Sequence, residues 1–284
     1  MTATLLLCCL CFGGQRLAGI GTMILSLQHP TVVLFKNFLS LKETEQLVER
    51  ARRGMSRSQI VGVDKDSLLA QDRTSYGAWL SGHEASRVEK RIQDVVGVPR
   101  EFGESIYVLR YQESQKYVPH YDNCGKQGEA LSERCWRFVS RAGGPQCGEG
   151  FGGATCGDRL ATFIMYLRSP ERGGQTVFPL ARSRGDQHES TSIQNKNMDK
   201  DSWWCSGDDI LMISPEPGDA VLFWDYIPKP GVEDPHMYKR RGSLKNGTMD
   251  TEAVADEAAY HGGCPVMEGE KWIATKWMRS AQYF

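Results

Sequence analysis

Residues 270–278, Glu-Lys-Trp-Ile-Ala-Thr-Lys-Trp-Met, constrain the fold of this chain most strongly. Lys271, Ile273, Thr275 and Trp277 recur at every second position, so on a β-strand they share one face. A lysine on the inward face of such a strand is costly to bury unless it meets an anion. The pattern therefore predicts a β-rich fold with a buried cation that faces an anionic ligand.

Metal-binding residue types occur at two places linked to this strand. His261 lies ten residues before Lys271, and His120 and Asp122 form a His-x-Asp pair upstream. At i and i+2 on a strand, or at its end, both side chains point to one side. The preceding residues 102–111 are rich in β-branched and aromatic types and predict a strand that enters the site, and the His-x-Asp pair follows after a short polar connection. Two imidazoles and one carboxylate can occupy one triangular face of an octahedral Fe(II) ion and leave three positions open.

A His-x-Asp pair alone is a weak signal, because ordinary chains contain one by chance and the histidine is then a surface or hydrogen-bonded residue. His236 competes for the role of second imidazole, but it lies in a Pro-rich stretch. His261 immediately precedes the strand that carries Lys271, so we prefer it. The other histidines lack a partner at a ligand spacing and are expected to be structural or exposed: His29, His83 and His188.

From about Leu27 onward the chain resembles the prolyl 4-hydroxylase (alpha subunit type) family of 2-oxoglutarate- and Fe(II)-dependent dioxygenases. The resemblance is carried by motifs in the order 29–40, 73–80, 111–122, 160–167, 173–179, 218–224 and 260–277. It implies a mostly β fold with flanking helices (α+β), built on a double-stranded β-helix or jelly-roll core. Short strands separated by turn signals independently favour a jelly roll.

The resemblance also implies a reaction and its cofactors. The expected activity is hydroxylation of peptidyl proline to 4-hydroxyproline in Pro-rich or collagen-like proteins, with Fe(2+), 2-oxoglutarate, O2 and L-ascorbate. The family's related lysyl hydroxylases and oxygen-sensing prolyl hydroxylases tend to carry arginine where Lys271 stands, so the lysine favours the prolyl 4-hydroxylase branch. The implied site residues are His120, Asp122 and His261 as iron ligands, Lys271 for the distal carboxylate of 2-oxoglutarate, Tyr111 and Thr162 in the co-substrate pocket, and Trp277 in the active-site wall.

Two other functional classes stay open. A catalytically silent relative that binds Pro-rich peptides would lose iron or co-substrate residues. Here the three iron-ligand candidates and Lys271 are all present. An oxygenase of the same fold acting on lysine, a free amino acid or a nucleobase would share the iron site and differ in its loops. A Pro-rich partner would dock on aromatic side chains, for which the candidates are Trp203, Trp204 and Tyr238.

The chain departs from the family pattern in a turn and in three insertions. Ser114 stands where the family usually has a glycine, which would relax the turn. The insertions span about 123–158, 181–207 and 228–259. Loops this long are usually functional or disordered. The basic run 239–241 within the third is expected to be solvated, and the net charge of −1 gives no sign of nucleic-acid binding.

Two helices are predicted before the strands. Ser40 and Glu43 form a capping box, followed by an amphipathic helix that ends near Gly54. Ser81 and Glu84 form a second capping box before a second helix, which is expected to end at Gly97. The inner faces are predicted to carry Leu47, Val48 and Ala51 in the first helix and Val88, Ile92 and Val95 in the second.

The N-terminal residues and the cysteines bear on localisation. Residues 1–25 are assigned to a hydrophobic leader, read as a weak signal peptide, a signal anchor or a mispredicted start, and residues 26–284 to the dioxygenase domain. Membrane association through the leader is left open, as is the oligomeric state. The six cysteines after the leader, with unassigned pairing, suit an oxidising lumen. We expect the lumen of the endoplasmic reticulum or secretory pathway.

Overall fold

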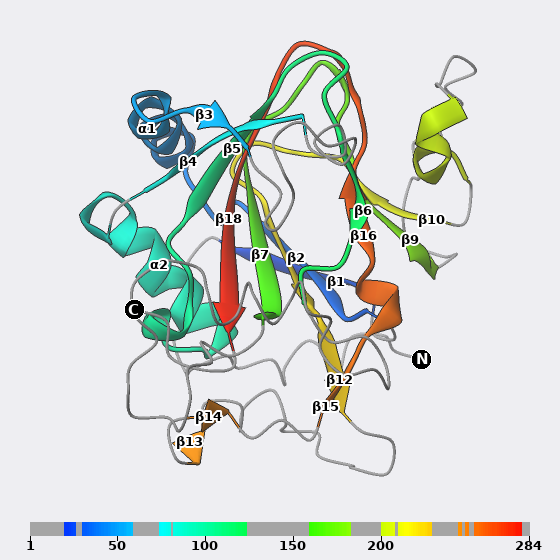
Figure 1. The fold of residues 1–284 in the computed structure, drawn as a ribbon. Coiled ribbons are helices and arrows are strands. Elements are labelled where there is room, and N and C mark those ends of the chain that lie inside the picture. The colour runs from blue at the N-terminus through cyan, green and yellow to red at the C-terminus, as the bar shows by residue number, and fades with distance from the viewer. Residues whose placement is uncertain are drawn as a thin grey trace, which may run out of the picture.

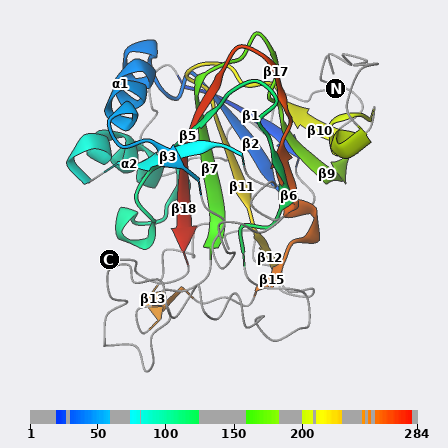
Figure 2. The same ribbon diagram turned by 45° about the horizontal axis from the view of Figure 1, so that its top comes forward.

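The computed structural model describes residues 20–26, 30–58, 74–80, 82–123, 159–182, 200–207, 210–228, 244–245, 248–249 and 253–279. Two antiparallel sheets form the centre of this part (Figures 1 and 2). The larger sheet has the strand order β1 (Gly21–Ser26), β2 (Val32–Lys36), β11 (Ala220–Trp224), β7 (Arg159–Arg168), β18 (Lys271–Arg279), β5 (Tyr107–Tyr111), β4 (Tyr76–Trp79) and β3 (Ser56–Arg57). The smaller sheet has the order β10 (Ile210–Ile213), β9 (Thr176–Arg182), β16 (His261–Gly263) and β6 (Tyr117–His120). The predicted jelly-roll class with flanking helices is confirmed.

Small elements complete the described residues. Three two-stranded pairs are β12 (Tyr226–Pro228) with β15 (Ala253–Ala255), β13 (Leu244–Lys245) with β14 (Thr248–Met249), and β17 (Val266–Glu268) with β8 (Arg172–Gly173). The helices are α1 (Leu41–Arg52), α2 (Gly82–Val96) and the 3-10 segments η2 (Arg100–Phe102), η3 (Lys200–Cys205) and η4 (Glu257–Ala259). In the described part of the chain, no helix has the length and apolar character needed to cross a membrane.

The alternation predicted for the C-terminal strand separates two hydrophobic cores. On one face of β18, Trp272, Ala274 and Met278 pack into the core that includes the helices. On the other, Ile273 and Trp277 belong to the core between the sheets. Figure 1 shows α1 and α2 on one side of the larger sheet and the smaller sheet on the other. The inner face of β18 therefore points at the space between the sheets, as the sequence predicts.

The first helix follows the predicted pattern. The Ser40 side chain accepts from the Glu43 backbone N–H, and Glu43 accepts from the Ser40 N–H at 2.9 Å, which completes the capping box. Arg91 of α2 donates to Glu43 at 2.7 Å and joins the two helices. The second capping box lies outside the described residues. All six side chains predicted for the inner helix faces are buried: Leu47, Val48, Ala51, Val88, Ile92 and Val95.

Two described elements lie within segments that the sequence assigns to a leader and to an insertion. Strand β1 begins at Gly21, so the larger sheet includes residues 21–25 of the predicted leader. The 3-10 segment η3 lies within the second predicted insertion and packs against the smaller sheet, and a disulfide joins Cys205 to Cys264. The other four candidate cysteines lie outside the described residues, as does the basic run 239–241.

Candidate active site

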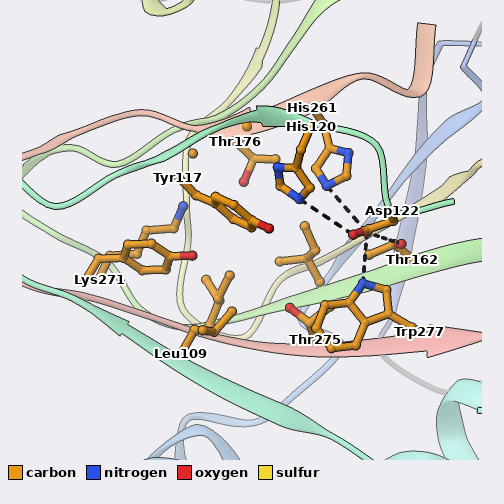
Figure 3. A pocket seen from close by; sticks show the side chains of 15 residues that line it. Leu109, Tyr117, His120, Asp122, Thr162, Thr176, His261, Lys271, Thr275 and Trp277 are labelled. Carbon is orange, nitrogen blue, oxygen red and sulfur yellow. Dashed lines mark hydrogen bonds and ion pairs between the residues drawn. The ribbon is translucent and has the colours of Figure 1, made fainter. Parts of the chain in front are cut away.

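The predicted iron ligands meet at one end of the smaller sheet. His261 begins β16 and pairs directly with His120, the last residue of the antiparallel strand β6. Asp122 follows in the bend after β6. The ligand atoms of these three residues all lie within 4.8 Å of one another, and Figure 3 shows the side chains turned toward a common point. The strand end expected at the His-x-Asp pair is therefore present.

Backbone carbonyls fix the orientation of both imidazoles. His120 Nδ1 donates to the carbonyl oxygen of Val118 at 2.9 Å, and His261 Nδ1 donates to that of Ala259 at 2.9 Å. This leaves each Nε2 turned toward Asp122, at 3.6 Å from Oδ1 for His120 and 3.5 Å from Oδ2 for His261. Hydrogen bonds of this kind set the tautomer of a metal-binding histidine.

The protonation states suit a metal site. Burial lowers the pKa of His261 to about 4, and repulsion from His120 adds to this, against the opposing effect of Asp122. Its imidazole is therefore neutral at pH 7. Burial alone would raise the pKa of Asp122, but His261, His120 and Arg159 outweigh it and hold that pKa well below its usual range. The site thus offers lone pairs and an ionised carboxylate, the donor set expected for Fe(II).

Two residues predicted to line the pocket also hold the ligand carboxylate. Thr162 on β7 donates its hydroxyl to Asp122 Oδ2 at 2.6 Å, and the indole Nε1 of Trp277 donates to the same oxygen at 2.9 Å. All three side chains are buried. The carboxylate is therefore held from the larger sheet, although Asp122 itself belongs to the chain that leaves the smaller one.

Lys271 lies at the other end of the same pocket. Its side chain is 3% exposed, and Nζ lies 5.7 Å from the ring centroid of Tyr111 and 5.9 Å from that of Tyr166. Burial lowers its pKa to about 7. Within the described residues its ammonium group makes no hydrogen bond and no ion pair. A buried ammonium group in this state fits an anionic ligand that enters the pocket.

The structure brings all seven predicted site residues together around this pocket. Its lining includes the three ligands and Lys271, together with Tyr111, Thr162 and Trp277. The aromatic residues proposed for substrate docking are not among them. Trp204 is buried with Val177 and Cys264 on the outer face of the smaller sheet, and Trp203 lies beside it and is 62% exposed. Tyr238 and the rival His236 lie outside the described residues, and His83 is exposed.

Three residues in or beside the pocket make contacts that the sequence analysis did not predict. Tyr117 stacks on His120 with ring centroids 3.7 Å apart, and Thr176 accepts from the Tyr166 hydroxyl at 2.9 Å. Both lie within segments that carry the family resemblance, so position in a motif was the available signal. Arg159 lies 3.5 Å from Asp122 Oδ1. Regular strand alternation would place Arg159 and Thr162 on opposite faces of the sheet. The register shifts at that end of β7, so alternation alone could not predict that Arg159 lies beside Asp122.

Comparisons with known proteins agree with this geometry. The family model of the 2OG-Fe(II) oxygenase superfamily matches residues 106–279. "Probable prolyl 4-hydroxylase 3" of Arabidopsis thaliana is 32% identical, over 95% of this chain and 78% of the relative. Prolyl 4-hydroxylase 5 of the same plant is 33% identical, over 90% of this chain and 70% of the relative.

Among solved structures, a viral collagen prolyl hydroxylase from Paramecium Bursaria Chlorella virus-1 aligns with a TM-score of 0.48 and 20% identity, over 88% of this chain and 96% of that one. The residues that the family model matches include His120, Asp122, His261 and Lys271. The chain belongs to the prolyl 4-hydroxylase family within the 2OG-Fe(II) oxygenase superfamily.

Proposed function

We propose that this protein hydroxylates proline residues in Pro-rich or collagen-like peptides at C4, with Fe(II), 2-oxoglutarate and O2. Its plant relatives are named prolyl 4-hydroxylases, which supports this substrate class. The observation that carries the proposal is the pairing of two features in one pocket. A His-Asp-His cluster lies at one end, and a buried lysine without an anionic partner among the described residues lies at the other.

The residues present fit both absent groups. His120, Asp122 and His261 would hold Fe(II) through two imidazole nitrogens and a carboxylate, which leaves positions for other ligands. Lys271 would hold the distal carboxylate of 2-oxoglutarate through a charge-assisted hydrogen bond. When bound, Fe(II) and 2-oxoglutarate together supply the activation of oxygen.

The chain itself contributes positioning and exclusion of water. The Val118 and Ala259 carbonyls and the Thr162 and Trp277 donors fix the three ligands before any ion arrives. Apolar side chains line the pocket between the ligands and Lys271, and they cover the region that the methylene groups of a dicarboxylate would occupy. These lining side chains are Leu109, Ile164 and Ile273.

The proposal extends to the reductant and the compartment. We propose that L-ascorbate keeps the iron ferrous and that the protein works in the lumen of the endoplasmic reticulum or secretory pathway. The Cys205–Cys264 disulfide supports an oxidising location, because such bonds are rare in reducing compartments.

Product analysis tests the proposal. A Pro-rich peptide is incubated with the protein, Fe(II), 2-oxoglutarate and ascorbate, beside a His261→Ala control, and the peptide is analysed by mass spectrometry. We expect one added oxygen on proline, absent from the control. Iron-dependent succinate formation with no oxygen on proline would show that the protein is an oxygenase whose substrate is not this class of peptide. Absence of both products from the wild-type protein would support a silent peptide-binding relative.

A further inference from the structure

A buried carboxylate outside the pocket is linked to the iron-ligand candidate Asp122 through one arginine. Glu104, in the segment between η2 and β5, is 3% exposed and is not one of the described residues that line the pocket. Its backbone N–H donates to the carbonyl oxygen of Trp277 at 2.9 Å. The main chain therefore ties Glu104 to β18, the strand that carries Trp277 and Lys271.

Two arginines meet at Glu104. Arg159, the first residue of β7, and Arg279, the last residue of β18, are register partners on adjacent antiparallel strands, where like charges repel. Arg159 Nε and Nη2 donate to Glu104 Oε1 and Oε2 at 2.7 and 2.9 Å, and Arg279 Nη1 donates to Oε1 at 2.6 Å. Burial alone would raise the pKa of Glu104, but the two arginines outweigh it and lower that pKa. The carboxylate is therefore ionised at pH 7.

Arg159 faces two carboxylates and binds them unequally. It makes a bidentate pair of hydrogen bonds to Glu104, whereas its Nη1 lies 3.5 Å from Asp122 Oδ1. That distance exceeds the range of about 2.7–3.2 Å for an N–H···O hydrogen bond. Trp277 restrains the guanidinium further, because Arg159 Cζ lies 3.9 Å from the centroid of the indole. The guanidinium is therefore held by Glu104 and only faces Asp122.

This arrangement keeps one oxygen of Asp122 accessible to a metal ion. Thr162 and Trp277 both donate to Oδ2. At Oδ1, Arg159 Nη1 and His120 Nε2 lie at 3.5 and 3.6 Å. A guanidinium released from Glu104 would form its own bidentate pair with Asp122, because arginine and carboxylate groups favour two parallel hydrogen bonds. That pair would occupy an oxygen that the metal needs.

We propose that Glu104 is a positioning residue of the metal site, which keeps Arg159 from competing with the metal ion for Asp122. The inference rests on the metal site of the proposed function and deepens it, because it adds a residue outside the pocket on which that site depends. Arg279 holds Glu104 from the other side, so the position of Arg159 is set by the ends of two adjacent strands.

Metal titration of variants tests the inference without peptide or turnover. The iron-free protein is titrated with Co(II) and followed by visible absorbance for the wild type, Glu104→Gln, Arg159→Met and the double variant. Glutamine keeps the shape of Glu104 but has one acceptor oxygen in place of two. Methionine packs on Trp277 and has no donor. Arg159→Lys is an independent variant that decides the question even if Glu104→Gln does not fold, because lysine keeps the charge and cannot make the bidentate contact.

Glu89→Gln is the matched control. Glu89 on α2 is a second buried carboxylate, and it accepts from Lys276 Nζ of β18 at 2.7 Å, on the helix side of the larger sheet. Breaking a buried ion pair is destabilising, so we expect a lower urea midpoint for unfolding. Co(II) affinity should stay within about twofold of the wild type, because the two sites are separate. The control thus distinguishes a loss of stability from a loss of metal affinity.

We expect Glu104→Gln and Arg159→Lys to weaken Co(II) binding about 10- to 100-fold, the usual cost of losing an outer partner of a metal ligand. Arg159→Met binds at least as tightly as the wild type, because the competing guanidinium is gone. The double variant stays within about twofold of Arg159→Met. Wild-type affinity in Glu104→Gln or Arg159→Lys, or an equal loss from Glu104→Gln with and without Arg159→Met, would overturn the inference and leave the proposed function standing.

Peptide hydroxylation by the wild type separates the two proposals. Co(II) affinities that follow the expected pattern, with no oxygen added to proline, would sustain the inference and overturn the proposed substrate class. Failure of the wild type to bind Co(II) would overturn both, because neither holds without the metal site.

Discussion

Replacing Thr162 by valine tests whether the hydrogen bonds around Asp122 prepare the metal site. Valine keeps the shape of the side chain and removes the hydroxyl that donates to Asp122 Oδ2 at 2.6 Å. A hydrogen bond to a charged acceptor contributes about 1.5–3 kcal/mol, and removing an outer partner of a metal ligand costs about 10- to 100-fold in affinity. Trp277 still donates to the same oxygen. We therefore expect a loss near the lower end, about tenfold, in affinity for a divalent metal.

The assay is titration of the iron-free protein with Co(II), followed by visible absorbance, which needs neither peptide nor turnover. Thr275→Val is the matched control, because Thr275 lines the same pocket on β18 and makes no hydrogen bond to Asp122. We expect it to keep wild-type metal affinity. If Thr162→Val binds Co(II) within about twofold of the wild type, the ligand carboxylate does not depend on this donor and the reasoning is refuted.

Two further predictions concern Lys271 and Ser114. Because the pKa of Lys271 is lowered to about 7 in the free protein and only the ammonium form attracts the carboxylate, the Kd for 2-oxoglutarate should rise above pH 7 by up to about tenfold per pH unit. Calorimetry on metal-loaded protein checks this, and a pH-independent Kd that matches that of Lys271→Met would contradict it. Ser114 has a φ of 65°, so Ser114→Gly should raise the free energy of unfolding by about 0.5–1 kcal/mol. Urea denaturation measures the change in the free energy of unfolding. Asn37→Gly serves as the control, because asparagine tolerates its φ of 56°. A lower urea midpoint for Ser114→Gly than for the wild type would refute the strain argument.

Periodicity and motif order were sufficient to predict the central part of the site. The two-residue period of β18 assigned Lys271 and Trp277 to one face, and both line the pocket. Helix α1 followed from its capping box and apolar stripe. These signals are local or repeat at a fixed period, so they can be detected in a single sequence. The iron ligands came from a weak pair and one distant histidine, which gained weight from the family resemblance.

Other features depend on contacts that no local pattern encodes. Arg159 reaches Asp122 because the register shifts where β7 meets the end of β18. The pairing of Cys205 with Cys264 is one of many that six cysteines allow. The mutual contacts of Trp79, Tyr107 and Trp277 arise from the lateral order of three strands, which sequence spacing does not give. The aromatic residues of the insertions were the docking candidates that the sequence offered, but Trp203 and Trp204 lie on the outer face of the smaller sheet.

The direct pairing of His120 with His261 bears on how the family can vary. The two histidines face each other across antiparallel strands, so strand register fixes their separation, whatever the length of chain between them. Closing a longer connection adds entropy cost only slowly, about 0.6 kcal/mol for each doubling of its length. Insertions between the ligand strands can therefore grow or shrink over evolutionary time without displacing the imidazoles. Selection can act on the connecting loops while the chemistry at the sheet end stays constant.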